Sequence, residues 1–217
     1  STNVLNGICA SEGKLNIPTK LATASGVAAS MSVFYEFRPL REGADTLFLW
    51  EVEDGEAYEL IITTYSGLYR YNMLDIVRID GFIGNTPNIV FCGKSTEFVE
   101  VAGQKIYGYQ FSDLLHDIEK RMSVNFDVVQ VFEENGKLFP VLESLEDVDY
   151  SVVKQRIDAY MSSHWCITSE AIYVMKKSYK KHEFDKRLTK DRGVCGIKLP
   201  TVLKEKPALD DIEEIVS

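Results

Sequence analysis

The pattern of apolar residues changes once along the chain, and this change limits the folds open to it. From Met31 to Val101, short segments rich in β-branched and aromatic residues alternate with turn residues, a pattern that indicates strands. These segments are Met31–Arg38, Thr46–Val52, Tyr58–Thr64 and Asp75–Phe82. Their short spacing favours hairpins of an antiparallel sheet or barrel over βαβ units.

After Gly103 the apolar residues take helical spacing. The pattern predicts helices over Tyr109–Met122 and around Val152–Met161, and strands over Phe126–Phe132, Lys137–Leu142 and Ala171–Met175. This order is typical of a small α+β domain with helices on one face of its sheet. The chain then becomes polar and basic, and we expect its acidic end, Asp210, Asp211, Glu213 and Glu214, to be a solvated tail.

The sequence therefore predicts an α+β protein: an antiparallel, β-rich, barrel-like subdomain followed by a small α/β sandwich-type C-terminal domain. The best boundary lies at Lys94–Ser95, which gives domains of residues 1–94 and 95–217. A chain of 217 residues can form one large or two small domains with an apolar core.

Composition and charge exclude some classes of protein. The 33 acidic against 24 basic residues give a net charge of −9, which argues against a nucleic-acid partner. No apolar run reaches the roughly eighteen residues of a membrane span, and no signal peptide is visible. The absence of an initiator Met suggests a piece of a longer protein. Four scattered cysteines favour reduced thiols and a cytoplasmic location, and nothing predicts an oligomeric state.

The segment that points most specifically to chemistry runs from Ile61 to Val77. An apolar strand ends in Thr-Thr-Tyr, Gly67 permits a tight turn, and a second strand carries Arg70 and Asp75. A carboxylate at a strand start after a turn can accept hydrogen bonds from two adjacent ribose hydroxyls. Composition alone favours a plainer interpretation, a hairpin whose Arg70 and Asp75 are solvated or paired.

The residues Thr-Thr-Tyr-x-Gly-Leu-Tyr-Arg-Tyr-x-x-x-Asp, from Thr63 to Asp75, resemble the signature of the plant auxin-responsive (Gretchen Hagen) acyl acid–amido synthetases. These enzymes belong to the acyl-adenylate-forming superfamily. The resemblance implies that Asp75 binds the ribose of ATP and that Tyr65 belongs to the nucleotide site. Leu74 stands where the family usually has Gly.

A second segment, Ala10-Ser11-Glu12-Gly13, is by itself no more than a surface loop. It resembles the family's Ser-Ser-Glu motif, which implies that Ser11 hydrogen-bonds phosphate and that Glu12 helps to hold Mg²⁺, a cation that prefers oxygen ligands. A Tyr just before that motif packs on adenine in the family. Ile8 takes its place here, and an aliphatic side chain can still cover a base, without stacking.

Two lysines complete the candidate site. Gly93-Lys94-Ser95 resembles the superfamily hinge, where Lys94 replaces the usual Arg and keeps its charge without the planar fork. The stretch from Gly193 to Pro200 resembles a C-terminal loop of the family, which implies that Lys198 contacts the carboxylate and α-phosphate oxygens and stabilises charge in the transition state. A solvated lysine is the plain alternative.

The resemblance implies an ATP- and Mg²⁺-dependent ligase. A carboxylic acid attacks the α-phosphate to give acyl-AMP, and an amine, usually an amino acid, then displaces AMP. It also implies that residues 1–94 close the large domain and that 95–217 form the small mobile domain. The phosphate loop and most of the acyl pocket are not in this sequence, so we expect the chain alone to bind nucleotide weakly and not to turn over.

Two alternatives stay open. One is a ligase of the same superfamily that uses coenzyme A or a carrier thiol as acceptor, although the signature from Thr63 to Asp75 speaks against it. The other is a non-catalytic nucleotide-binding pseudoenzyme, which the departures at Ile8, Leu74 and Lys94 keep possible.

Overall fold

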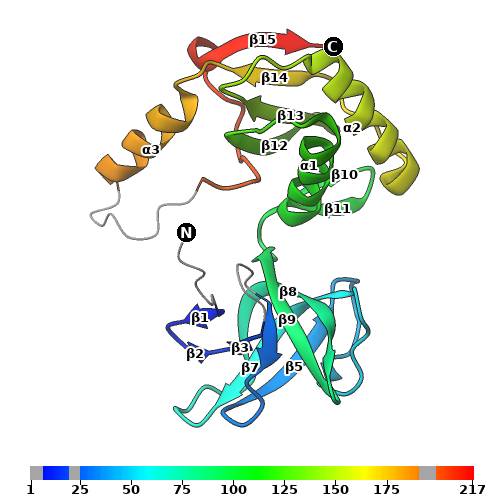
Figure 1. Ribbon diagram of the computed structural model, residues 1–217, viewed down its shortest axis with the longest axis vertical. Helices are drawn as coiled ribbons and strands as arrows, with labels where there is room; N and C mark the ends of the chain where they lie inside the picture. Colours follow the sequence, from blue (N-terminus) through cyan, green and yellow to red (C-terminus); the bar gives the residue numbers. More distant parts are fainter. Residues whose placement is uncertain (1–6, 20–24, 191–198) are drawn as a thin grey trace. The chain divides into compact units, whose positions relative to one another are not determined.

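The computed structural model describes residues 7–19, 25–190 and 199–217 of the chain. The chain divides into two compact units, Ser1–Thr96 and Glu97–Ser217, each with its own sheet (Figure 1). Each unit also has its own apolar core. The division falls between the strand-rich and the mixed part of the sequence.

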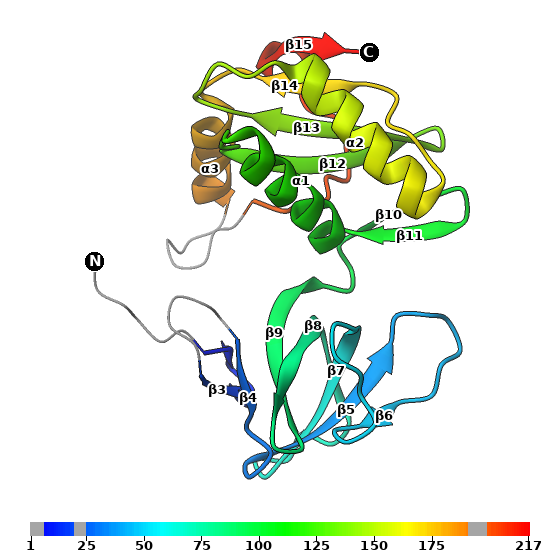
Figure 2. The same cartoon turned by 45° about the vertical axis from the view of Figure 1, so that its right-hand side comes forward.

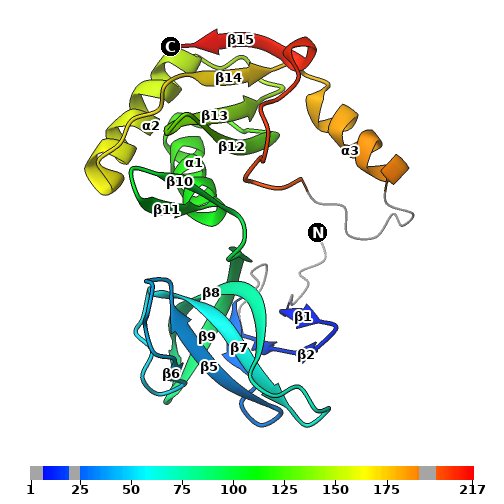
Figure 3. The same ribbon diagram turned by 180° about the vertical axis from the view of Figure 1, so that it is seen from behind.

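The first unit is built from strands (Figure 3). They are β1 (Cys9–Ala10), β2 (Gly13–Lys14), β3 (Asn16–Pro18), β4 (Gly26–Ala28), β5 (Val33–Pro39), β6 (Leu47–Phe48), β7 (Ala57–Thr64), β8 (Tyr71–Ile83) and β9 (Thr86–Lys94). Strands β1 and β2 pair with each other, and the others form a curved sheet in the order β3-β4-β9-β8-β7-β5-β6. Every pair in this sheet is antiparallel, as the short spacing of the segments predicts.

Alternation along the strands builds the core of this unit. In β5, Val33, Tyr35 and Phe37 are buried in one cluster, whereas Phe34 between them is half exposed. Side chains from the neighbouring strands complete the cluster, among them Leu60, Ile62, Val77, Ile79 and Ile89. Full burial of an aliphatic or aromatic side chain of this size contributes roughly 1.5–3 kcal/mol.

The sequence prediction is wrong at Thr46–Val52, where the strand is limited to β6. After Phe48 the chain turns, because the backbone N–H of Phe48 donates to the Glu51 carboxylate at 2.7 Å and the Glu51 N–H donates to the Phe48 carbonyl at 2.9 Å. Trp50 then stacks on Phe48, with 5.1 Å between ring centroids. Residues with strand propensity are thus held in a turn by a side chain that caps it.

The second unit mixes helices and strands. Its elements are β10 (Phe98–Val101), β11 (Gln104–Tyr107), α1 (Gly108–Met122), β12 (Val128–Glu134), β13 (Lys137–Glu143), α2 (Tyr150–Trp165), β14 (Ile172–Met175), α3 (Tyr179–Lys190), a 3₁₀ turn (Leu209–Asp211) and β15 (Ile212–Val216). The main sheet has the order β12-β13-β14-β15, in which only β13 and β14 are parallel. Helices α1 and α2 cover one face of it (Figure 2).

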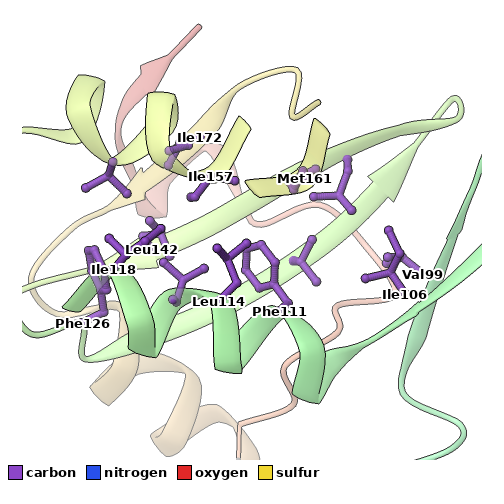
Figure 4. Close-up of a cluster of buried hydrophobic side chains, with 14 of the residues drawn as sticks. Val99, Ile106, Phe111, Leu114, Ile118, Phe126, Leu142, Ile157, Met161 and Ile172 are labelled. Carbon is purple, nitrogen blue, oxygen red and sulfur yellow. The ribbon is translucent and has the colours of Figure 1, made fainter. Parts of the chain in front are cut away.

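Both faces of this sheet are buried. Figure 4 shows the cluster under α1 and α2, where Phe111 and Leu114 of α1 meet Ile157 and Met161 of α2 over the strands. On the opposite face, Phe132 stacks on Phe139 with 4.9 Å between ring centroids. The fold class predicted from the sequence, an antiparallel β-rich part followed by a small α/β part, is confirmed.

Helix α3 and strand β15 of the second unit were not predicted from the sequence. Helix α3 is polar on most of its surface, so its pattern lacks the apolar stripe that marks a packed helix. The acidic end of the chain is not a free tail, because Ile215 pairs with Tyr173 and places β15 at the edge of the sheet. Its carboxylates Glu213 and Glu214 remain exposed, as expected. No helix among the described residues is long and apolar enough to cross a membrane.

Candidate functional site

The signature segment forms a turn between β7 and β8 that presents Tyr65. Gly67 takes a φ of +104°, which a side chain would disfavour, and its N–H donates to the Thr64 carbonyl at 3.2 Å. The Thr64 N–H in turn donates to the carbonyl of Leu68 at 2.9 Å. The Tyr65 ring is 95% exposed, so it is available for contact with a ligand.

Arg70 holds this turn on the sheet. Its guanidinium donates to both carboxylate oxygens of Glu36 on β5, with Nε–Oε2 at 3.0 Å and an Nη2–Oε1 ion pair at 2.8 Å. Its backbone, at a φ of +46°, donates from N–H to the hydroxyl of Thr63 at 3.0 Å. Arg70 is therefore paired, the plainer of the two interpretations of this residue. The sequence analysis missed Glu36, although a single carboxylate within the apolar strand segment Met31–Arg38 was a usable signal.

We expect Arg70→Ala to lower the free energy of unfolding of the first unit by about 2–4 kcal/mol. The Glu36 side chain is only 8% exposed and would lose its charge partner, although the exposure of Arg70 limits the cost. Urea unfolding followed by Trp50 fluorescence in a Trp165→Phe background measures the effect. The double variant Arg70→Ala, Glu36→Gln should regain part of the loss. An equal or larger loss in the double variant would contradict this account of the pair.

Asp75 lies where β8 pairs with the end of β9, opposite Lys94. The residue is 6% exposed, and the Lys94 ammonium forms an ion pair with its Oδ1. Apart from this ion pair, the buried Oδ1 accepts no hydrogen bond from the described residues. Lys94 also donates to the carbonyl of Met73 at 3.4 Å. The two candidate residues, 19 positions apart in the sequence numbering, are thus in direct contact.

Leu74 adopts the backbone conformation that explains the glycine usual at this position. Its φ is +56°, a left-handed value that is unfavourable for a residue with a Cβ. Two hydrogen bonds fix it: Leu74 N–H donates to the Asn72 side chain at 2.9 Å, and Ser95 N–H donates to the Leu74 carbonyl at 2.8 Å. The turn before Asp75 therefore keeps this geometry with leucine in place of glycine.

We expect Leu74→Gly to preserve the stability of the first unit or to raise it by up to about 1 kcal/mol. Relief of the left-handed strain, about 1–2 kcal/mol, exceeds the entropy cost of glycine, about 0.5–1 kcal/mol, and the side chain is 42% exposed. Ile83→Gly, at an exposed position of the same strand without a positive φ, is the control and should lose stability. Urea unfolding compares the two variants. A larger loss for Leu74→Gly than for Ile83→Gly would contradict the assignment of strain.

Ser11 and Glu12 form the turn of the β1–β2 hairpin, where Ser11 Oγ donates to Glu12 Oε2 at 3.0 Å. Ser11 is exposed and Glu12 is half-buried, so the turn is accessible. Ile8, an aliphatic side chain that could cover a base, is 9% exposed and belongs to the core of the unit. Its burial against other apolar side chains leaves it unavailable to a ligand.

One core cluster supports the two motifs of the first unit. Ile8 and Ala10, next to the Ser11–Glu12 turn, pack in the same cluster as Leu68 and Met73 of the signature. The bases of both motifs therefore share one packed interior. Lys198 lies outside the described residues. The chain that follows it is anchored, since Gln130 donates from Nε2 to the Pro200 carbonyl at 2.8 Å.

The second unit contains a hollow of about 310 Å³ beside the start of α3. Both of its carboxylates have partners: Glu143 accepts from the Lys180 N–H at 2.7 Å, and Asp127 pairs with the Lys180 ammonium at 3.8 Å. Burial raises the pKa of Glu143, and the Lys180 N–H opposes that effect. The Glu143 carboxylate thus binds a backbone N–H in the first turn of α3. No cluster of three metal-ligating side chains occurs among the described residues.

The chain is similar in sequence to known proteins. Residues 26–94 match the GH3 family central domain. The chain is 44% identical over 63 residues to jasmonoyl–L-amino acid synthetase JAR4 of Nicotiana attenuata, which is 27% of this chain and 11% of that protein. It is 33% identical over 91 residues to the probable indole-3-acetic acid-amido synthetase GH3.1 of Arabidopsis thaliana, which is 42% of this chain and 15% of that protein.

Two solved structures share the fold. The GH3.15 acyl acid amido synthetase superposes with a TM-score of 0.68 at 18% identity, over 94% of this chain and 40% of that one. A 2-hydroxyisobutyryl-CoA ligase in the postadenylation state superposes with a TM-score of 0.54 at 9% identity, over 84% and 38% of the two chains. The chain thus spans about two fifths of each solved structure.

The fold is shared with part of an acyl acid amido synthetase and part of an acyl-CoA ligase. Residues 26–94, which hold the Thr63–Asp75 signature, match the GH3 central domain, and the relatives similar to the chain are named as amido and amino acid synthetases. The resemblance predicted from the sequence is confirmed.

Proposed function

We propose that the chain is the C-terminal part of an ATP-dependent acyl acid–amido synthetase. It would supply three residues of the adenylation site: Asp75 for the ribose, Glu12 for the metal and Lys198 for the adenylation step. The observation that supports this most is the Asp75 carboxylate, which is buried and whose Oδ1 has the Lys94 ammonium as an ion-pair partner but no further hydrogen bond from the described residues. A carboxylate can accept more hydrogen bonds than one ion pair supplies. Two adjacent ribose hydroxyls would supply such donors.

The other residues fit the remaining parts of a nucleotide. Mg²⁺ commonly takes one or two protein carboxylates and completes its shell with phosphate oxygens and water, which suits the single carboxylate of Glu12. The Ser11 hydroxyl would then donate to a phosphate. The exposed ring of Tyr65 would pack on the nucleotide, and Lys94, beside Asp75, would lie next to the ribose.

The proposed reaction has two steps. A carboxylate oxygen of the acyl acid attacks the α-phosphorus of ATP, and the bond to pyrophosphate breaks. The nitrogen of an amino acid then attacks the acyl carbon, loses a proton, and AMP leaves. Lys198 would stabilise the charge that develops on the oxygens in the first step. The second unit would present this lysine for the first step and withdraw it for the second, a form of gating that protects the intermediate from water.

The acceptor and the location belong to the same proposal. The family match favours an amino acid over coenzyme A or a carrier thiol, because the matched relatives are named as amido and amino acid synthetases. Cys166 carries a free, exposed thiol, in keeping with the reducing cytoplasm. Leu74 keeps a positive φ, the conformation that glycine favours, so the replacement of glycine by leucine does not argue strongly for a pseudoenzyme.

ATP–pyrophosphate exchange by the full-length synthetase tests the proposal. We expect exchange that depends on a carboxylic acid and on Mg²⁺, and an amide product when amino acids are added. Nucleotide binding without exchange for any acid of a broad panel would favour the pseudoenzyme. Release of AMP with coenzyme A but with no amine would favour the thiol ligase.

A further inference from the structure

The hairpin that carries Ser11 and Glu12 is too small to hold its own position. Strands β1 and β2 have two residues each and pair only with each other. An isolated two-stranded hairpin is marginal in water even when it is longer. The direction in which Glu12 points must therefore be set by contacts at the base of the hairpin.

The first of these contacts is the side chain of Asn16, at the start of β3. It is fully buried, its Oδ1 accepts from the Ile8 N–H at 2.6 Å, and its Nδ2 donates to the Ile89 carbonyl at 3.1 Å. Ile89 lies in β9, the strand that ends at Lys94. One amide thus ties the residue that precedes β1 to the strand that pairs with Asp75.

The second contact is the hydroxyl of Tyr35 on β5. Tyr35 is 2% exposed, and its hydroxyl donates to the Leu15 carbonyl at 2.6 Å. Leu15 closes the hairpin, since its N–H donates to the Ile8 carbonyl at 2.9 Å. Burial raises the pKa of Tyr35, so the hydroxyl stays protonated and able to donate. Both ends of the hairpin base are thus hydrogen-bonded to strands of the main sheet.

We propose that Asn16 and Tyr35 are positioning residues, which hold the Ser11–Glu12 turn at a fixed place relative to Asp75 and so determine how strongly Mg²⁺ increases the affinity for ATP. The inference rests on the proposed function, in which Glu12 holds the metal. Apolar side chains could fill the same volume, but fully satisfied buried polar groups fix a single geometry, which a metal ligand requires.

The variant Tyr35→Phe tests the proposal because it removes one hydroxyl and preserves the ring. Its matched control is Tyr58→Phe: Tyr58 is 4% exposed in the same core, and its hydroxyl accepts from the Glu53 N–H at 3.1 Å, away from the hairpin. Titration calorimetry on the full-length synthetase gives the affinity for ATP with Mg²⁺ and with a chelator. Melting curves check that both variants lose similar stability.

We expect Tyr35→Phe to reduce the Mg²⁺-dependent gain in ATP affinity by about 3- to 10-fold, the effect of one hydrogen bond, without changing the affinity for AMP. Tyr58→Phe should change neither. Equal Mg²⁺-dependent gains in the two variants would overturn the proposal and leave Tyr35 with a structural role only. Asn16→Leu should act in the same direction, but it is the variant more prone to misfold.

A Glu12→Gln variant separates this inference from the proposed function. If Glu12→Gln leaves the Mg²⁺-dependent gain intact, the metal role of Glu12 is wrong. If Glu12→Gln abolishes the gain while Tyr35→Phe matches its control, the positioning inference alone is wrong. If both hold, the double variant should lose no more than Glu12→Gln.

Discussion

The Asp75→Asn variant of the full-length protein is expected to bind ATP and AMP about 100-fold more weakly than the unchanged protein. Asparagine has the same shape but offers only one acceptor oxygen and no charge. The loss of one charge-assisted hydrogen bond and the weakening of a second amount to about 3 kcal/mol. Titration calorimetry with AMP measures this directly, because AMP has the ribose but needs no metal.

The control for this variant is Asp80→Asn in the same strand. Asp80 accepts from the Ser25 hydroxyl at 2.6 Å, so it is a hydrogen-bonded carboxylate five residues from Asp75 that has no proposed ligand. It should keep its affinity for AMP. Similar affinities for the two variants would show that Asp75 is the structural partner of Lys94 and nothing more.

The second large effect is expected for Lys198→Ala, which should slow ATP–pyrophosphate exchange by about 10²- to 10³-fold. This is the usual range when a single group that stabilises transition-state charge is removed. Formation of the amide from a chemically prepared acyl-adenylate should keep its rate, since that step does not use the lysine. The measurement compares the rate of ATP–pyrophosphate exchange with the rate of amide formation from the acyl-adenylate.

Lys204→Ala is the matched control, because Lys204 is an exposed lysine six positions further along the chain. It should leave both half-reactions unchanged. An equal loss in both half-reactions for Lys198→Ala would indicate a structural defect, and no loss in exchange would remove Lys198 from the catalytic site.

Secondary structure could be predicted from the sequence where local propensity and tertiary packing favour the same element. The β7–turn–β8 unit was predictable because a run of apolar residues, a required glycine and a second strand follow one another within the signature. The prediction was wrong at Thr46–Val52, where the strand propensity of Leu-Phe-Leu-Trp is overruled by the cap that Glu51 places on Phe48 N–H. The prediction was also wrong at β15, because this segment pairs with β14 although its charge suggested a solvated tail.

In the candidate site too, some residues could be predicted from the sequence and others could not. Asp75, Lys94, Ser11 and Glu12 were reached through motifs, each of which is local in the sequence. The contacts that hold these residues in place could not be found through motifs, because the partners lie far apart in the chain. Glu36 is 34 residues from Arg70, and Ile89 is 73 residues from Asn16. Only the fold reveals such pairs, and it also shows why leucine can replace glycine before Asp75.

Asp75 and Glu12 are proposed to bind the ribose and the metal of one ATP. A crystal structure of the full-length protein with a non-hydrolysable ATP analogue and Mg²⁺ would show this contact. We expect both ribose hydroxyls within hydrogen-bond distance of the Asp75 carboxylate and the metal within about 2.1 Å of a Glu12 oxygen. A nucleotide bound elsewhere, with Asp75 still in contact with Lys94 alone, would contradict the proposal.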